Sequence, residues 1–291
     1  MTRERNGGPV DRTARRTSGD FVEALARGLD IVTCFGPTAV ELTVSDVATR
    51  TGLARPTARR LLMTLETLGY VRSDDGVYSL TTRVLRLGTA GIAAQGLWDV
   101  ARPHLAALVR RTNESSSMSQ LDGSDIVYTA RVPVAKIIAL SVNIGTLFPA
   151  VATSMGHVLL SEHSASELDE VLATPSRSGI IPRVVPSRAA LDTSFATVRD
   201  RGWALSDEAL SVGIRSIAAP VRDTKGRITA AANVTVHAAE TSIEKLTDEY
   251  LPHLLETTAA ITAAWADRAL LPVASADEDA DVGSSVRSSD R

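Results

Sequence analysis

The side chains best suited to chemistry in this 291-residue sequence are arginines, and several of them lie in one short segment. In TGLARPTARRLLMTLETLGYV, residues 51–71, leucines recur at helical spacing and Arg59 and Arg60 stand between them. On a helix the leucines share one face, and these two arginines lie on the opposite face. From Arg50 to Arg86 there are seven arginines and three carboxylates, although the whole chain has a net charge of −3. Phosphate binding needs such a local excess of positive charge.

A second, shorter helix must hold this arginine helix in place. The preceding sequence LTVSDVATR, residues 42–50, has apolar side chains on one helical face, and Thr43 or Ser45 can cap its start by accepting a backbone N–H bond. Gly52 ends this helix, because the position after a helix favours a left-handed backbone. Ala48 is small enough for two helices to approach closely. This spacing predicts a helix-turn-helix, in which the second helix enters the major groove of DNA.

The segment after the arginine helix, YVRSDDGVYSL, has β-forming residues on both sides of an SDDG turn, so it predicts a hairpin that serves as a wing. Arginine can donate two hydrogen bonds to guanine, and threonine can contact a phosphate or a thymine methyl group. The alternative is an ordinary amphipathic helix whose surface arginines are only solvated. The predicted DNA contacts are Thr43, Ser45, Arg55, Pro56, Thr57, Arg59, Arg60 and Arg72.

Composition divides the chain into five segments. The two ends lack apolar periodicity, one being basic and the other acidic and rich in serine, so both are predicted to be disordered tails. A basic arm that follows the phosphate backbone is the alternative for the first tail. The predicted segments are a basic tail at 1–20, a winged helix-turn-helix at 21–80, a linker helix whose apolar stripe suits a partner chain at 81–97, a second domain at 98–266 and an acidic tail at 267–291.

The second domain alternates predicted helices with predicted strands. SSSMSQLDGSDIVYTARV predicts two strands about a DGSD turn, IRSIAAPV and ITAAANVTV predict two more joined through RDTKGR, and KIIALSV adds a fifth. Helices are predicted at about 98–111, in ATSMGHVLLS, in SELDEVL, in AALDTSFATVRDRG and in SIEKLTDEYLPHLLETTAAITAAW. The predicted fold class is therefore α+β, with a mixed, mostly antiparallel sheet flanked by helices.

Other classes of protein find little support. The sequence has no GK[ST] nucleotide loop, no G-x-S-x-G elbow and no dinucleotide glycine fingerprint, and its five histidines include no i, i+4 pair. The single cysteine, Cys34, allows no disulfide within the chain, which fits a reducing cytoplasm. No apolar run approaches the roughly 18 residues of a bilayer span, and no secretion signal is expected.

We therefore expect no catalysis, no cofactor, no metal and no membrane partner. Two alternatives remain. One is a small-molecule sensing or dimerisation module that binds no DNA, and the other is an enzyme whose active site follows no known motif.

The chain resembles the isocitrate lyase regulator (IclR) family of bacterial transcription factors over about residues 21–266. The resemblance rests on ARGLDIV, LTVSDVATRTGLARPTARRLLMTLETLGYV, SLTTRVLRLG, LDGSDIVYTARV, ATSMGHVLLS and DEALSVGIRSIAAPV, in this order and spacing. It implies a winged helix-turn-helix, a linker helix that helps to form a homodimer, and a GAF-like effector-binding domain with a cupped antiparallel sheet, without catalysis. A dimer places two DNA-binding units about one helical turn apart on a roughly palindromic operator. A tetramer is left open.

Within the family, VNIGTLFPAVATSMGHVLL is most similar to regulators of aromatic-acid breakdown through the β-ketoadipate pathway. The resemblance therefore implies a small aromatic or keto carboxylic acid as effector and catabolic genes as targets. Three positions depart from the family's pattern: Ala54 stands where serine is common, Pro56 where alanine is common, and His157 where arginine is common. Losing a serine cap costs about 1 kcal/mol, whereas a proline in the first turn of a helix is tolerated.

The resemblance also places the effector pocket, which we expect to hold a carboxylate with serine, asparagine and backbone donors. Each candidate has a structural alternative, since Ser154 can cap its helix, Arg215 can pair with Asp207 or Glu208, and methionines are common in cores. The predicted contacts are Met118, Thr153, Ser154, Met155, Gly156, Asp207, Gly213, Arg215, Ser216, Ile217, Asn233 and Thr235.

Overall fold

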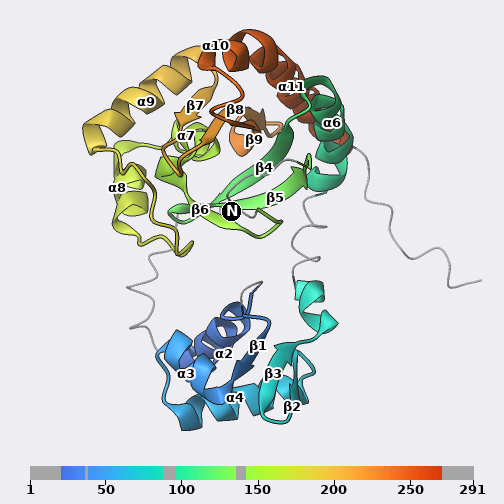
Figure 1. Ribbon diagram of the computed structural model, residues 1–291, viewed down its shortest axis with the longest axis vertical. Coiled ribbons are helices and arrows are strands. Elements are labelled where there is room, and N and C mark those ends of the chain that lie inside the picture. The colour runs from blue at the N-terminus through green and yellow to red at the C-terminus, as the bar shows by residue number, and fades with distance from the viewer. Residues whose placement is uncertain (1–20, 37–38, 88–95, 136–141, 271–291) are drawn as a thin grey trace, which may run out of the picture. The chain divides into compact units, whose positions relative to one another are not determined.

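A computed structural model describes residues 21–36, 39–87, 96–135 and 142–270 (Figure 1). The chain splits into two compact units between residues 94 and 95. Parts of several predicted segments lie outside the described residues. These are the N-terminal tail, residues 88–95 of the linker helix, residues 136–141 of the KIIALSV strand, and residues 271–291 of the acidic tail.

The first unit packs helices against a small antiparallel sheet in which β3 is the middle strand. Its elements are α2 (Glu23–Thr33), β1 (Glu41–Thr43), α3 (Val44–Thr51), α4 (Arg55–Thr67), β2 (Val71–Asp74) and β3 (Val77–Leu80). The predicted hairpin is confirmed, and it turns at Asp75 and Gly76, both with positive φ. The strand β1 was not predicted. Its Leu42 is buried opposite Tyr78 of β3, so the residues just before α3 add a third strand to the hairpin.

The hydrophobic core of the first unit includes the buried face of α4. Ala58 and Leu62 are fully buried in it, and Leu61 and Leu65 pack against them. Leu68, predicted to share this apolar stripe, is instead 50% exposed. The helix ends at Thr67, so Leu68 is its C-cap and leaves the helical face that the stripe follows.

The second unit is built on one antiparallel sheet with the strand order β6-β5-β4-β9-β8-β7 (Figure 1). Every pair of neighbouring strands in it is antiparallel, as the sequence predicts for most of them. Its strands are β4 (Ser115–Asp122), β5 (Asp125–Val132), β6 (Leu147–Pro149), β7 (Ala204–Asp207), β8 (Ile214–Arg222) and β9 (Ile228–His237). Its helices are α6 (Leu97–Thr112), α7 (Ser154–Leu160), α8 (Ala165–Ala173), α9 (Arg188–Arg201), α10 (Ile243–Lys245) and α11 (Leu251–Leu270).

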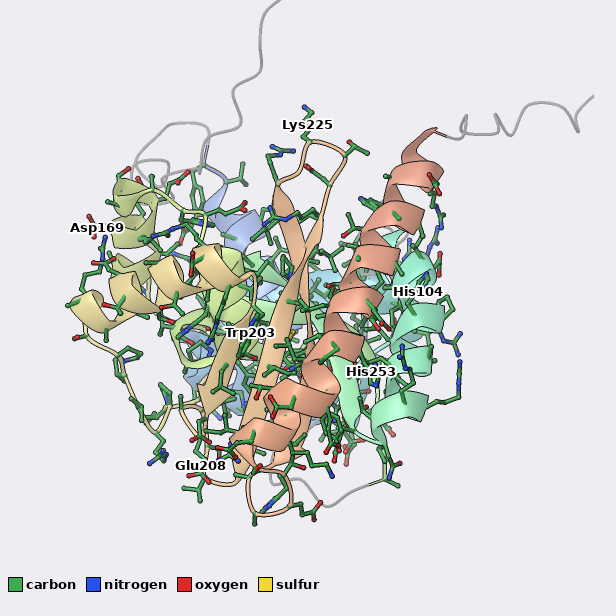
Figure 2. The ribbon with its side chains drawn as sticks, turned by 90° about the horizontal axis from the view of Figure 1, so that it is seen from above. His104, Asp169, Trp203, Glu208, Lys225 and His253 are labelled. Atoms are coloured by element: carbon green, nitrogen blue, oxygen red, sulfur yellow. The ribbon has the colours of Figure 1, made fainter. Side chains whose placement is uncertain are left out.

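Helices cover both faces of this sheet. Successive strand residues point to opposite sides, and both sides carry apolar residues that pack against helices. On one face, Ile217 and Val234 pack with Leu105 of α6 and Leu254 of α11. Figure 2 shows α11 beside the β8–β9 hairpin, whose tip is marked by Lys225. On the other face, Ala218 of β8 and Ala231 of β9 pack with Met155 of α7 and the buried residues of α8 and α9. The sheet thus separates two apolar layers.

The last predicted helix is interrupted. Between α10 and α11, residues Leu246–Tyr250 form a π-helical segment. Pro252 lies in the first turn of α11 and has no N–H to donate to the carbonyl four residues earlier. A local widening of the helix is a common response to such a missing bond.

Candidate functional site

The arginine helix of the first unit is fixed by a corner and a cap. Gly52 has φ 69° and ψ 14°, the left-handed conformation predicted for it, and the Leu53 N–H donates to the Ala48 carbonyl at 3.1 Å. Thr43 caps α3 reciprocally: its hydroxyl accepts from the Asp46 N–H, and the Asp46 carboxylate accepts from the Thr43 N–H at 2.9 Å. A hydrogen bond from the Thr43 hydroxyl to the Asp46 carboxylate, together with the one from the Thr43 N–H, lowers the pKa of Asp46. α3 and α4 therefore form the predicted helix-turn-helix.

The start of α4 lacks such a cap. Ala54 occupies the N-cap position without a side-chain hydrogen bond, and Pro56 lies in the first turn, where its missing N–H costs no helical bond. Among the described residues, the Ser45 hydroxyl contacts the Arg55 guanidinium across the corner. Ser45 and Arg55, two of the predicted DNA contacts, thus bind each other in this structure.

The outward face of α4 is exposed and basic. Arg59 and Arg60 are both exposed, and no residue in the described part of the chain forms an ion pair with either. A groove runs between this face and the hairpin, and Gly76 and Tyr78 form its hairpin side. Four of the predicted DNA contacts line the groove, namely Arg55, Pro56, Arg59 and Arg60.

The other predicted contacts of the first unit lie around this groove. Arg72, in β2 of the wing, is exposed and donates from Nε to the Ser79 hydroxyl at 2.9 Å. Thr57 lies instead on the side of α4 that faces α2. Thr43 is exposed, and its hydroxyl is engaged in the cap of α3.

The second unit contains a pocket between the sheet and α7. The cavity volume of the pocket is about 40 Å³. The pocket is therefore narrow in this structure, well below the usual volume of a small-molecule site. Six of the predicted effector contacts line it: Thr153, Ser154, Met155, Ser216, Asn233 and Thr235.

Strand register brings these polar residues together from distant parts of the sequence. Thr235 of β9 lies between Ser115 of β4 and Ser216 of β8. The Ser216 hydroxyl is 2.7 Å from the Ser154 hydroxyl on α7, and the Asn233 amide donates to the Thr235 hydroxyl at 2.9 Å. One part of the pocket wall is thus a row of neutral hydroxyl and amide groups.

The remaining predicted effector contacts do not line the pocket. Met118 and Ile217 are buried in the opposite layer, beneath α6 and α11, because successive strand residues point to opposite faces of the sheet. Asp207 and Arg215 pair at 2.7 Å and share the face of Ile217, which is the structural alternative considered for Arg215. The Arg215 guanidinium also donates to the Thr241 carbonyl at 2.6 Å.

Both predicted glycines have structural roles. A Cβ added to Gly156 would lie 1.9 Å from the carbonyl oxygen of Ala150, so α7 can approach the preceding turn only with glycine there. Gly213 has φ 78°, and its N–H donates to the Glu208 carboxylate at 3.0 Å in the turn before β8.

Tyr128 and Arg131 are among the pocket-lining residues that were not predicted. Both belong to β5 and are three residues apart, so simple alternation would place them on opposite faces. A β-bulge changes this: Met118 of β4 pairs with Ala130, whereas the next residue, Ser119, pairs with Tyr128. Thr129 is the extra residue, and Tyr128 and Arg131 therefore share the pocket face. Bulges often redirect a side chain in this way.

Burial shapes the titration of both side chains. Arg131 is half-buried, which lowers the pKa of its guanidinium, and it donates to the Ser117 hydroxyl at 3.1 Å. Burial raises the pKa of Tyr128 to about 12, against a smaller opposing effect of Arg131. Both groups are in their donating forms at neutral pH, and Arg131 is the one charged side chain among the described residues that line the pocket.

His157 does not carry the charge that arginine would carry at its position. It lies behind the pocket, where Nε2 is 2.8 Å from the Val151 carbonyl and Nδ1 is 2.8 Å from the Ser194 hydroxyl. The carbonyl can only accept, so the proton resides on Nε2 and Ser194 donates to Nδ1. Burial lowers the pKa of His157. The side chain therefore joins α7 to α9 as a neutral group.

Within the described ranges, no group of three or more His, Cys, Asp or Glu side chains is placed to bind a metal ion. None of the described helices is both long enough and apolar enough to cross a bilayer.

Comparison with known families covers most of the chain. Residues 24–75 match the family described as the IclR helix-turn-helix domain, and residues 89–263 match the family described as bacterial transcriptional regulator IclR, C-terminal. These two matches coincide with the helix-turn-helix of the first unit and the sheet of the second. The matched families consist of transcriptional regulators, not enzymes.

Individual relatives agree with this assignment. The chain is 35% identical to the Pca regulon regulatory protein of Pseudomonas putida, over 81% of each chain. It is 33% identical to the p-hydroxybenzoate hydroxylase transcriptional activator of Acinetobacter baylyi, over 82% of this chain and 90% of the relative.

Solved structures share the fold. A protein from Rhodococcus sp. RHA1, proposed to be a transcriptional regulator, is 42% identical with a TM-score of 0.71, over 84% of this chain and 98% of that one. An IclR homologue from Microbacterium hydrocarbonoxydans, solved in complex with 4-hydroxybenzoate, has the same TM-score at 24% identity, over 84% of this chain and 99% of that one. The chain studied here belongs to the IclR family of bacterial transcriptional regulators.

Proposed function

We propose that this regulator controls genes of aromatic-acid breakdown by binding duplex DNA with its first unit and a small aromatic carboxylic acid with its second. The observation that carries the DNA-binding part is the exposed face of α4, where Arg59 and Arg60 have no carboxylate partner among the described residues. Unpaired guanidinium groups beside a groove and a wing are suited to base edges and phosphates.

The pocket supports the effector part. Its described walls combine apolar side chains with neutral hydroxyl groups and one arginine, which suits a small ring that bears an acid group. The names of two relatives concern a Pca regulon and a p-hydroxybenzoate hydroxylase, and a protein of the same fold was solved with 4-hydroxybenzoate. A hydroxylated benzoate is therefore the effector to test first.

We infer that the protein acts as a homodimer on a roughly palindromic operator in the cytoplasm. An apolar surface between α2 and α4 supports dimerisation, because Leu25 and Leu29 of α2 and Met63 of α4 are each more than half exposed there. Apolar patches of this kind usually mark contact surfaces. Whether two dimers join is a separate question, which analytical ultracentrifugation of the DNA-free protein answers.

The proposed domain limits separate the DNA-binding segment from the effector-binding segment. Residues 21–80 bind DNA, residues 81–97 link the units, and residues 98–266 bind the effector, with the tails outside both. Helix α11 continues to Leu270, four residues beyond the limit assigned to the effector domain. Limited proteolysis should release fragments that begin or end within the linker.

A gel-shift assay against the DNA upstream of the protein's own gene tests the proposal. We expect specific binding. The logarithm of its association constant should fall steeply with the logarithm of salt concentration, because phosphate contacts release counterions. Absent or salt-independent binding would contradict the DNA-binding part. A thermal-shift screen of aromatic and keto acids tests the effector part, which fails if no acid raises the melting temperature.

A further inference from the structure

Two side chains in the pocket carry hydrogen-bond donors that bind no acceptor among the described residues. The Tyr128 side chain is 6% exposed and lines the pocket, and its hydroxyl makes no hydrogen bond with any described residue. The Arg131 guanidinium has five N–H donors, of which one is used by the Ser117 hydroxyl in the described part of the chain. Donors that line a pocket and bind no protein acceptor are available to a ligand, so a ligand that supplies acceptors gains affinity from hydrogen bonds with them.

The two donors are also electrostatically related. Tyr128 and Arg131 are close enough for each to influence the pKa of the other, and the bulge at Thr129 directs both into the same space. The other polar groups that line the pocket are hydroxyls and an amide, which are neutral. A half-buried cation with a neutral donor beside it selects an anion with more than one acceptor oxygen, and a carboxylate fits that description.

We propose that Arg131 and Tyr128 jointly bind the carboxylate of the effector. Arg131 donates charged hydrogen bonds, and Tyr128 donates a neutral one. This pair makes the pocket select an acid over an uncharged molecule of the same shape. The inference rests on the proposed function of the pocket as the effector site, and it names the two residues that determine which chemical class is accepted.

The test compares an acid with its isosteric amide. Full-length wild-type protein is titrated calorimetrically with 4-hydroxybenzoate and with 4-hydroxybenzamide, which keeps the ring and the hydroxyl but has no charge. We expect wild type to prefer the acid by about 100-fold, the scale of one desolvated charge pair. Arg131→Gln should abolish that preference by weakening acid binding, with amide binding little changed. Tyr128→Phe should weaken acid binding about tenfold.

Matched variants separate recognition from folding. Arg102→Gln removes an exposed arginine of α6 and should leave both affinities unchanged. Thermal melting identifies any unfolded variant, and Arg131→Met, which keeps the apolar stem, replaces Arg131→Gln if the latter does not fold. Folded Arg131 variants that retain the preference for the acid overturn the inference but leave the proposed function intact. If wild type binds neither 4-hydroxybenzoate nor 3,4-dihydroxybenzoate, the effector assignment itself is overturned.

Discussion

Arg59 in the first unit and Arg131 in the second are the same kind of side chain in opposite surroundings. Arg59 is exposed on α4 and faces solvent beside a groove, whereas Arg131 is half-buried in a pocket of neutral groups. An exposed arginine contributes to binding mainly within a cluster, and its contribution falls with salt. A half-buried arginine is screened less and can discriminate between individual small molecules. In the proposed function, one chain thus uses arginine for a long polyanion on an open surface and for a single anion in a cavity.

The largest effect should follow from removing the open cluster. In the double variant Arg59→Ala with Arg60→Ala, we expect operator affinity to fall by at least about 100-fold, because each base contact contributes ~1 to 3 kcal/mol. Effector affinity and melting temperature should remain those of wild type, since neither arginine has an ion pair among the described residues. Gel shift, calorimetry and thermal melting measure the three quantities.

Arg102→Ala is the control for this variant, because Arg102 is exposed on α6 of the other unit. A double variant that still binds the operator with wild-type affinity would remove the basis of the comparison. Loss of folding would show instead that the two arginines are structural.

A second contrast concerns how tightly the chain packs around one glycine in each unit. Gly156→Ala should destabilise the second unit by about 3 kcal/mol or more, because the new Cβ would collide with the backbone at Ala150. Gly28→Ala in α2 meets nothing within 4 Å and should stabilise the first unit by about 0.5 to 1 kcal/mol.

Tryptophan fluorescence isolates the first of these effects, since all three tryptophans (Trp98, Trp203 and Trp265) lie after residue 95. Hydrogen exchange of the α2 amides measures the second. Equal stability changes in the two variants would mean that the surroundings of the two glycines do not differ in packing as described.

Features that depend on residues close together in the sequence were predicted better than features that depend on distant residues. Gly52, the Thr43 cap and the SDDG turn act through residues a few positions apart, so the helix-turn-helix and its wing could be predicted. Leu42 was assigned to a helix start because its partner, Tyr78, is 36 residues away, and no local pattern shows that strand pairing.

The pocket was predicted only in part, for the same physical reason. Ser154, Ser216 and Asn233 belong to segments that the resemblance identifies as pocket-forming. Met118 and Ile217 belong to such segments too, but side chains one residue apart on a strand point to opposite layers. Tyr128 and Arg131 were missed because a bulge depends on how two strands pair, and it leaves no signal in the composition of either strand.

A smaller effect should follow from the cap that orients the DNA-binding surface. Thr43→Ala removes the hydroxyl that accepts the Asp46 N–H, and it should cost about 1 kcal/mol. Faster hydrogen exchange in α3 reports the loss, and weaker operator binding should accompany it because α3 supports α4. Thr43→Ser retains the hydroxyl and should behave like wild type. Unchanged exchange in the alanine variant would show that the cap contributes nothing to the surface.

The smallest predicted effect is a pH dependence confined to the second unit, which contains all five histidines. Burial lowers the pKa of His157 in the folded state, so the unfolded chain takes up its proton first, near pH 6.5. The free energy of unfolding should therefore decrease as pH falls below about 6.5, and it should be insensitive to this group above that value. His157→Gln should flatten this decrease when tryptophan fluorescence follows denaturation in urea. An identical slope in the variant would assign the pH dependence to other groups.

The extra residue in β5 is open to genetic change. Thr129 is only partly buried and its hydroxyl is 3.4 Å from the Met118 carbonyl, so codons for other residues should be tolerated at that position. Loss of the codon would remove the bulge and leave Tyr128 and Arg131 two positions apart on a regular strand, where strict alternation keeps both on the pocket face. Descendants of this gene can therefore substitute or lose residue 129 and still direct both side chains to the same side of the sheet.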